Sequence, residues 1–339
     1  MEWGVRITDE SVIKHYTSLL NKMHIPHAWQ VEGGRTLAAT KINASLASLQ
    51  SPMFRGKQAH ENDGGYYYWQ HFPYAGLWSD MCARTRPYGG GIFAKHRPIY
   101  TDHGNFIHYD PFSVKDMADG ANRFIANLSY SRGGESTRHT GPSTMFRYLY
   151  QAGYDWLGAE QMYGPEDVIM SSLRGASKAY NKKDFGSLHA VQWGGSRPFI
   201  DPKHSLRFFL SLAVAYIHGS SHINTEEGLW TDEYANDRYT KAGKEHLYAQ
   251  HQMYDYIQTH SRKGELQAKI AVIQGRNDAW KSFGRSSLWS QDGDKWKFNK
   301  AMESFDLLKI FYPENRLDFC STDGLFTHTP IWYCRYSPY

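Results

Sequence analysis

The segment FGSLHAVQWGGSRPFIDPKHSLRFFLSLAVAYIHGSSHINTE, residues 185–226, contains a complete strand–helix–strand pattern. Residues 185–193 predict a strand, the apolar run at 202–219 predicts a helix that ends at Gly219, and residues 221–226 predict the next strand. Two strands joined through a helix in so short a stretch indicate a parallel pair, because parallel strands need a crossover connection.

The same alternation continues on both sides of this segment. Helices are predicted at 144–153, 165–180 and about 236–260, the second from apolar positions that recur every three or four residues. Residues 154–160 predict a further strand, and AKIAVIQG at 268–275 is typical of a fully buried parallel strand. Four strands separated by three helices in about 120 residues predict a parallel sheet built of βαβ units.

The architecture that fits this pattern best is a barrel. A doubly wound sheet usually carries a glycine-rich phosphate loop after an early strand, and the sequence has neither a G-x-G-x-x-G nor a Walker-type loop. We therefore predict an α/β fold in which residues 1–275 form a (β/α)8 TIM barrel. Residues 276–339, with a helix at 297–312, are predicted to be a C-terminal extension or the start of a further domain. The first 150 residues are turn-rich and aromatic, which suits long functional loops.

Charge and hydropathy exclude two classes of partner. The 339 residues carry a formal net charge of +4, from 38 basic and 34 acidic residues mixed along the chain. There is no Lys/Arg block of the kind that tracks phosphates, so no nucleic-acid partner is predicted. No stretch reaches the roughly 20 apolar residues of a membrane span, and the start MEWGVRITDE lacks the features of a signal peptide. We expect a soluble protein; secretion, a periplasmic location and oligomerisation all stay open.

Aromatic residues make up 15% of the chain, with 11 Trp, 24 Tyr and 17 Phe. Such rings are suited to stacking on the apolar faces of sugars, although a large barrel core would also use them. The cysteines Cys82, Cys320 and Cys334 lie far apart, which gives no sign of a zinc ribbon or a disulfide scaffold.

Two glutamates end predicted strands and are the candidate catalysts. Glu160 ends DWLGAE and Glu226 ends HINTE, with one predicted strand between them. Carboxylates at the carboxyl ends of barrel strands converge on the face where TIM-barrel enzymes place their active sites. A protonated and an ionised carboxylate across a cleft suit glycoside hydrolysis. Each could instead be a loop glutamate in an ion pair.

The tetrapeptide T-E-E-G at 225–228 resembles the [ST]-E-x-G strand end that carries the nucleophile in many retaining (β/α)8-barrel glycoside hydrolases. This resemblance covers roughly residues 140–275. It implies that Glu226 is the nucleophile and Glu160 the acid/base, and that Glu227 does not contact the reacting bond. In those enzymes the acid/base ends the fourth strand and commonly follows an asparagine, whereas Ala159 precedes Glu160 here.

Further polar and aromatic residues lie in loops or at strand ends that would face the same cleft. Arg138 and His139 could bind sugar hydroxyls or a charged substituent, which makes an anionic sugar one option for the substrate. The alternatives for these residues are a solvated loop, a simple turn or, for the tryptophans, the core. The substrate-binding candidates are His60, Glu61, Asp63, Trp69, Arg138, His139, Gln192, Trp193, Glu227, Trp230 and Asn277.

We therefore predict an enzyme that hydrolyses an oligo- or polysaccharide without a cofactor. Two alternatives stay open: a metal-dependent barrel isomerase or hydrolase acting on sugars, and a catalytically inactive carbohydrate-binding barrel. Seventeen histidines could supply metal ligands, but they are scattered, with no H-x-H in the first strand and no H-E-x-x-H. A nucleophilic serine is not indicated, because there is no G-x-S-x-G motif. The sugar, its linkage, and endo or exo action stay undetermined.

Overall fold

The computed structural model divides the chain into two compact units, Met1–Gly158 and Ala159–Tyr339, and the division falls inside a strand. It describes residues 3–5, 10–31, 52–60, 122, 125–126, 128–129, 132, 136–141, 146–162, 166–191, 203–226, 231–232, 238–239, 241–266, 270–274, 317–321 and 331–332.

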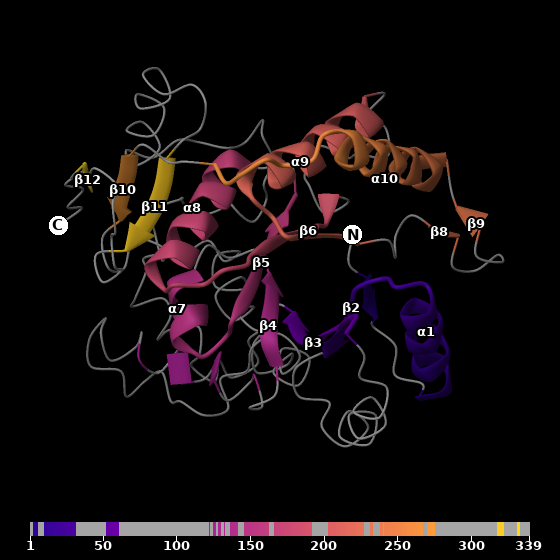
Figure 1. The fold of residues 1–339 in the computed structure, drawn as a ribbon, viewed down its shortest axis with the longest axis horizontal. Helices are drawn as coiled ribbons and strands as arrows, with labels where there is room; N and C mark the ends of the chain where they lie inside the picture. Colours follow the sequence, from indigo (N-terminus) through magenta and orange to yellow (C-terminus); the bar gives the residue numbers. More distant parts are fainter. Residues whose placement is uncertain are drawn as a thin grey trace, which may run out of the picture. The chain divides into compact units, whose positions relative to one another are not determined.

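Seven strands form one sheet in which each strand lies next to its neighbours in the chain (Figure 1). The pairs β1/β2, β2/β3, β3/β4 and β6/β7 are parallel. The strands are β1 (Trp3–Val5), β2 (His27–Val31), β3 (Phe54–His60), β4 (Ser136–Gly141), β5 (Trp156–Gln161), β6 (Gly186–His189) and β7 (His222–Thr225).

This strand order agrees with the predicted α/β class and with the parallel sheet. A doubly wound sheet reverses its strand order at a switch point, whereas the strands of a (β/α)8 barrel follow one another in chain order. The order β1 to β7 contains no reversal. The described part of the chain is therefore an α/β fold with a sequentially ordered sheet, as a barrel requires.

The first unit contains two described helices, α1 (Glu10–Lys22) and α7 (Phe146–Gln151). The side chains of α7 are buried from Phe146 to Tyr150, which is why so short a helix is stable in its place. In β3, Gly56 has a φ of 99°, a conformation that glycine adopts at little cost. Close by, the register with β4 shifts between Lys57 and Gln58, so β3 is an irregular strand.

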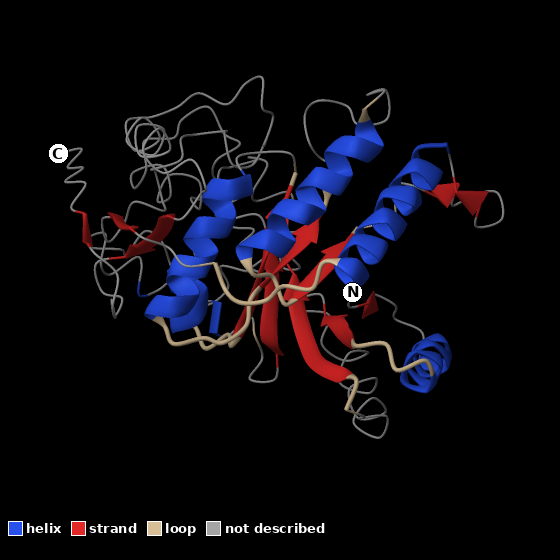
Figure 2. Cartoon of the chain, turned by 45° about the horizontal axis from the view of Figure 1, so that its top comes forward, coloured by secondary structure: helices blue, strands red, loops and turns tan. Residues whose placement is uncertain are grey.

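The second unit contains three long helices: α8 (Glu166–Ala179), α9 (His204–His218) and α10 (Lys241–Thr259). They lie side by side along the strands, α9 between α8 and α10 (Figure 2). Helix α9 ends as its sequence predicts: Gly219 takes the left-handed conformation, with a φ of 111°, and its N–H bonds to the carbonyl of Tyr216. The short strands β8 (Thr231–Asp232) and β9 (Arg238–Tyr239) form an antiparallel pair.

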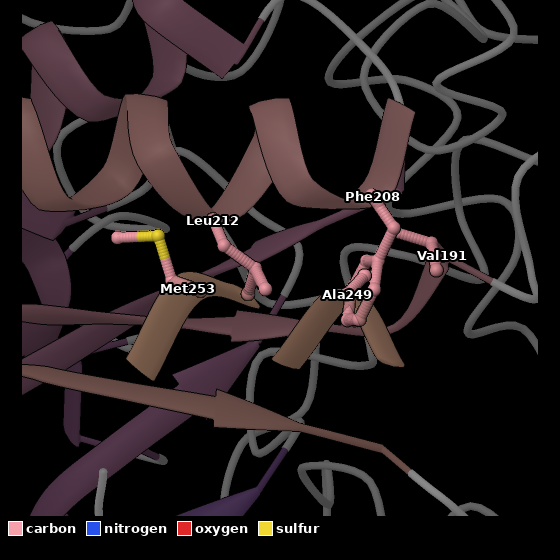
Figure 3. Close-up of a cluster of buried hydrophobic side chains, with 5 residues drawn as sticks. All are labelled: Val191, Phe208, Leu212, Ala249 and Met253. Atoms are coloured by element: carbon pink, nitrogen blue, oxygen red, sulfur yellow. The ribbon is translucent and has the colours of Figure 1, made fainter. Parts of the chain in front are cut away.

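Helices α9 and α10 meet in a cluster of buried apolar side chains. Figure 3 shows Phe208 and Leu212 of α9 pointing toward Ala249 and Met253 of α10, with Val191, just beyond β6, beside them. The cluster fastens both helices to the carboxyl end of β6, because Val191 is two residues from the last residue of that strand.

The predicted strand at 268–275 exists, but not as a barrel strand. It is β10 (Ile270–Gln274), and it pairs in parallel with β11 (Leu317–Ser321) and β12 (Ile331–Trp332) in a separate three-stranded sheet. Helix α8 lies against β11. A strand that closes a barrel after β7 is thus not among the residues that the structure describes. The domain boundary at residue 275 stays a prediction, and the helix predicted at 297–312 lies outside the described residues.

Residues 136–143, which contain Arg138 and His139, read from the sequence as a loop between a strand and a helix. This prediction is wrong over most of its length, because Ser136–Gly141 is the strand β4. Its buried polar side chains find partners on the adjacent strand, which lets a polar sequence form a buried strand. Among the helices of the described ranges, none is long and apolar enough to span a bilayer.

We expect Leu212→Ala to lower the free energy of unfolding by about 2–5 kcal/mol, because it leaves a cavity in the cluster between α9 and α10. Leu212 is 2% exposed, whereas Leu210 on the same helix is 52% exposed. Leu210→Ala is therefore the matched control and should change stability by less than about 0.5 kcal/mol. Urea denaturation followed by circular dichroism measures both, and equal losses would contradict the packing of this cluster.

Candidate active site

The helices of the second unit cover one side of strands β6 and β7. His189 of β6 forms a hydrogen bond with Ser211 of α9, Nδ1 to Oγ at 2.9 Å. Gln250 of α10 donates from Nε2 to Oγ1 of Thr225 in β7 at 2.6 Å. Because side chains alternate along a strand, the residues that follow His189 and Thr225 point to the other side of the sheet. Glu226 directly follows Thr225, so it lies on the side away from α9 and α10.

Strand register places Glu160 on this same side. The N–H of Ala190 donates to the carbonyl of Gln161 at 2.9 Å, which sets Gln161 of β5 level with His189 of β6. Gln161 therefore shares the helix side with His189, and Glu160, one residue earlier, faces the opposite side. Both predicted catalysts point away from the helices.

The two glutamates are held at the same edge of the sheet by backbone hydrogen bonds. The N–H of Glu226 donates to the carbonyl of His189 at 3.0 Å, while Ala190 is bonded to Gln161. Strand β6 thus lies between the two glutamates. The residue of β7 that is level with Glu160 lies two positions before Glu226 in the chain. With strands about 4.8 Å apart and about 3.3 Å of rise per residue, their backbones are roughly 12 Å apart.

The two carboxylates differ in their surroundings. Glu160 is 2% exposed, whereas Glu226 is half-buried. Glu160 is the last residue but one of β5, the fifth strand of the sheet, whereas the acid/base of the retaining enzymes ends the fourth strand.

A polar cluster in the first unit contains two of the predicted binding residues. Gln58 donates from Nε2 to Oγ1 of Thr140 at 3.2 Å, and His60 Nδ1 lies 2.9 Å from the same hydroxyl. The guanidinium of Arg138 lies 3.8 Å from the ring centre of Trp156, a cation–π contact. All five side chains are buried. His60 and Arg138 therefore belong to one cluster that joins β3, β4 and β5.

His139 is not part of this cluster. It follows Arg138 in β4 and so points to the opposite side of the strand, where its ring centre lies 5.2 Å from that of Tyr154. The other predicted binding residues lie outside the described residues: Glu61, Asp63, Trp69, Gln192, Trp193, Glu227, Trp230 and Asn277.

A buried hydrogen-bonded chain, which the sequence analysis did not anticipate, lies on the helix side of β6. Ser211 of α9 donates from Oγ to Oε1 of Glu166, in the first turn of α8, at 2.5 Å. His189 Nδ1 lies 2.9 Å from Ser211 Oγ, and His189 Nε2 lies 3.0 Å from Oγ of Ser187. We call Glu166, Ser211, His189 and Ser187 the relay. Its only sequence signals are a serine inside an apolar helix and a histidine inside a buried strand.

Burial pushes both ionisable members of the relay toward their neutral forms. Burial raises the pKa of Glu166 to about 7, with Asp167 adding to the rise and the bonds to Ser211 and the charge of Arg207 opposing it. Burial lowers the pKa of His189 to about 3, and nearby His246 lowers it further. Near neutral pH the relay therefore contains a neutral imidazole and a carboxyl that titrates.

Several histidines are core residues of the second unit. His204 and His246 are almost completely buried, and both rings pack against the ring of Phe208. The ring centre of Phe208 is 3.7 Å from that of His246. Scattered histidines are more often found at surfaces or behind a site, and these are instead packed between α9 and α10. Within the described ranges, no group of three His, Cys, Asp or Glu residues could hold a metal ion.

No family model matches the chain, and no curated protein matches it. Among solved structures, the chain is similar to one described as the crystal structure of GH5_18 from Streptomyces cattleya in complex with GlcNAc. The two share 11% sequence identity over 93% of this chain and 89% of that chain, with a TM-score of 0.43. At this identity and TM-score, no activity and no residue role follow from the similarity.

We expect Gly158→Ala to destabilise the protein by about 1–3 kcal/mol. A Cβ atom at this position would lie 2.8 Å from Cγ2 of Thr140 and 2.8 Å from the Trp156 ring, which would displace the ring that stacks on Arg138. Gly264→Ala is the matched control, because nothing lies within 4 Å of its Cβ position. Urea denaturation compares the two, and an unchanged midpoint for Gly158→Ala would contradict the close packing of β4 against β5.

We expect Glu166→Gln to stabilise the protein increasingly as the pH rises from about 4.5 to about 7. The folded protein keeps the Glu166 proton in this range while the unfolded chain releases it, so the wild type loses stability with rising pH, by up to about 1.4 kcal/mol per pH unit. His189 acts in the opposite direction as the pH falls from about 6.5 to about 3, but it is present in both proteins and largely cancels.

The measurement is the difference in unfolding free energy between Glu166→Gln and the wild type, from urea titrations at intervals between pH 4 and pH 8. The difference should level off above about pH 7, where Glu166 is ionised in both states. A difference that does not depend on pH would contradict the raised pKa of Glu166.

Proposed function

We propose that the protein is a glycoside hydrolase that cleaves an oligo- or polysaccharide with Glu160 and Glu226 as its two catalytic carboxylates. One observation carries this proposal: backbone bonds through β6 hold both glutamates at the carboxyl edge of the sheet, on the side that α9 and α10 do not cover. Active sites of (β/α)8 enzymes are built at this edge, and glycoside hydrolysis needs two carboxylates facing one bond.

The sheet is proposed to be part of a (β/α)8 barrel, with residues 1–275 as its domain. The sequential strand order and the parallel pairs support this architecture. The eighth strand that closes such a barrel would come from outside the described residues, since β10 belongs to another sheet.

In the proposed mechanism, Glu160 protonates the glycosidic oxygen while Glu226 attacks the anomeric carbon. The bond to the leaving sugar breaks as a bond between Glu226 and the anomeric carbon forms. Glu160, now ionised, then takes a proton from a water molecule whose oxygen attacks the anomeric carbon. The bond between that carbon and Glu226 breaks, which releases the sugar and returns Glu226 as a carboxylate. These two roles are assigned from the resemblance of T-E-E-G at 225–228 to the strand end that carries the nucleophile in retaining enzymes.

The distance between the carboxyl groups decides whether the anomeric configuration is retained. Retention requires about 5–5.5 Å and inversion about 6.5–9.5 Å. Backbones roughly 12 Å apart are compatible with retention only if both side chains lean toward the strand between them. We propose retention because T-E-E-G resembles the strand end of retaining enzymes, and nuclear magnetic resonance of the first-formed sugar product distinguishes the two outcomes.

The polar cluster of the first unit is proposed to contribute to substrate binding. Arg138 and His60 carry N–H donors suited to sugar hydroxyls or to an anionic substituent. The substrate-binding roles of Glu61, Asp63, Trp69, His139, Gln192, Trp193, Glu227, Trp230 and Asn277 stay predictions from the sequence.

We expect Glu160→Gln and Glu226→Gln each to reduce kcat by several orders of magnitude, because each removes one of the two groups that perform the chemistry. The assay is hydrolysis of a panel of aryl glycosides and polysaccharides, with circular dichroism to establish that each variant folds. Azide should restore activity to Glu226→Ala by replacing the lost nucleophile, which separates the nucleophile from the acid/base.

The matched control is Glu265→Gln, which neutralises an exposed glutamate away from both strand ends and should keep wild-type activity. A chelator such as EDTA should leave the rate unchanged. If the wild type cleaves a substrate and both Glu160→Gln and Glu226→Gln keep its rate, the two-carboxylate site is wrong. Loss of activity with EDTA would favour a metal-dependent enzyme instead.

A further inference from the structure

We propose that the relay is a positioning device for the proposed nucleophile: Glu166, Ser211 and His189 fix the end of β6, and β6 fixes Glu226. The inference rests on the proposed function for its catalytic meaning, while its structural part can be tested without any activity. None of these three residues touches the side of the sheet where the two glutamates face, so all three are positioning residues and not catalytic ones.

The relay spans three elements of the second unit. Its hydrogen bonds connect the first turn of α8 through the middle of α9 to the last residue of β6. Ser211 is 3% exposed and His189 is fully buried, so water does not compete for the bond between these two side chains. Three elements that are separate in the sequence are thereby held at one point.

The hydrogen bonds of the relay have one direction. The one hydroxyl proton of Ser211 is donated to Glu166, so Ser211 Oγ accepts from N–H of His189 at Nδ1. His189 Nε2 then accepts from the hydroxyl of Ser187. Each donor has one acceptor in this order, and the imidazole is fixed in a single tautomer and a single orientation.

The backbone of His189 connects its imidazole to the proposed nucleophile, Glu226. The carbonyl of His189 accepts the N–H of Glu226 at 3.0 Å, so the residue whose ring is anchored to α9 also holds the backbone of Glu226. Strand β6 has only four residues and ends at His189. A short strand has few ladder bonds of its own, and its end therefore depends on the anchor behind it.

The amide of Glu226 reports on this arrangement directly. We expect Ser211→Ala to increase its hydrogen exchange about tenfold, because loss of the anchor lets the bond between Glu226 and His189 open more often. The protein is used without ligand, and exchange is followed by mass spectrometry on a peptide that covers residues 222–228. The amides of the α10 core, around Met253, serve as an internal reference that should not change.

Three variants make the result specific. Glu166→Ala also breaks the relay and replaces Ser211→Ala if that variant fails to fold. Glu166→Gln keeps an oxygen acceptor for Ser211 and should stay close to the wild type. Ser171→Ala is the matched control, since Ser171 is a fully buried serine of α8 whose hydroxyl has no hydrogen-bond partner among the described residues.

A second readout uses the best aryl glycoside found for the wild type. We expect Ser211→Ala to lower kcat about tenfold with little change in KM. Glu166→Gln, which keeps the oxygen acceptor, should keep most of the wild-type kcat. Wild-type exchange at Glu226 in Ser211→Ala and Glu166→Ala, or equal acceleration in Ser171→Ala, overturns the positioning role. If the wild type cleaves nothing while exchange changes as expected, the proposed function fails and the structural coupling stands.

Discussion

Two backbone hydrogen bonds at the carboxyl end of β6 determine where the candidate catalysts lie. One joins Ala190 to Gln161 of β5, and the other joins Glu226 of β7 to His189. Parallel strands fix register along with spacing, so these bonds decide both the distance between the glutamates and the side of the sheet to which they point. A shift of one residue in either strand would turn one of the glutamates toward the helices and remove it from the site.

The sequence predicted the second half of the sheet well because each element there has its own local signal. Helix α9 is an apolar run that ends at Gly219, and the glycine takes the left-handed conformation that such an end requires. Strand β5 ends at Gln161, one residue after Glu160, and β7 ends at Thr225, one residue before Glu226, so the predicted strand ends located both candidate catalysts to within one residue. Strand register, which sets the sides, follows from pairing and is absent from local patterns.

Strand β4 and the bond between Glu166 and Ser211 were not predicted, because the signals for them are not local in the sequence. Strand β4 contains Arg138, His139 and Thr140 in succession, and all three are buried, so a rule that places polar residues in loops fails there. Their burial is satisfied by β3 and β5, which are remote in the sequence. The bond between Glu166 and Ser211 likewise joins residues 45 positions apart, and no spacing rule relates them.

The serine between Glu166 and His189 explains how an acid and a base can share a core without forming an ion pair. Removing two charges from water costs more than their attraction returns unless the geometry is very good. The pKa of His189 falls and that of Glu166 rises, because burial disfavours the charged form of each group. Ser211 accepts from one and donates to the other, so both keep a hydrogen bond while the imidazole stays neutral. The residue that ends β6, His189, is thereby anchored as a neutral imidazole, so its ring places no positive charge behind the two glutamates.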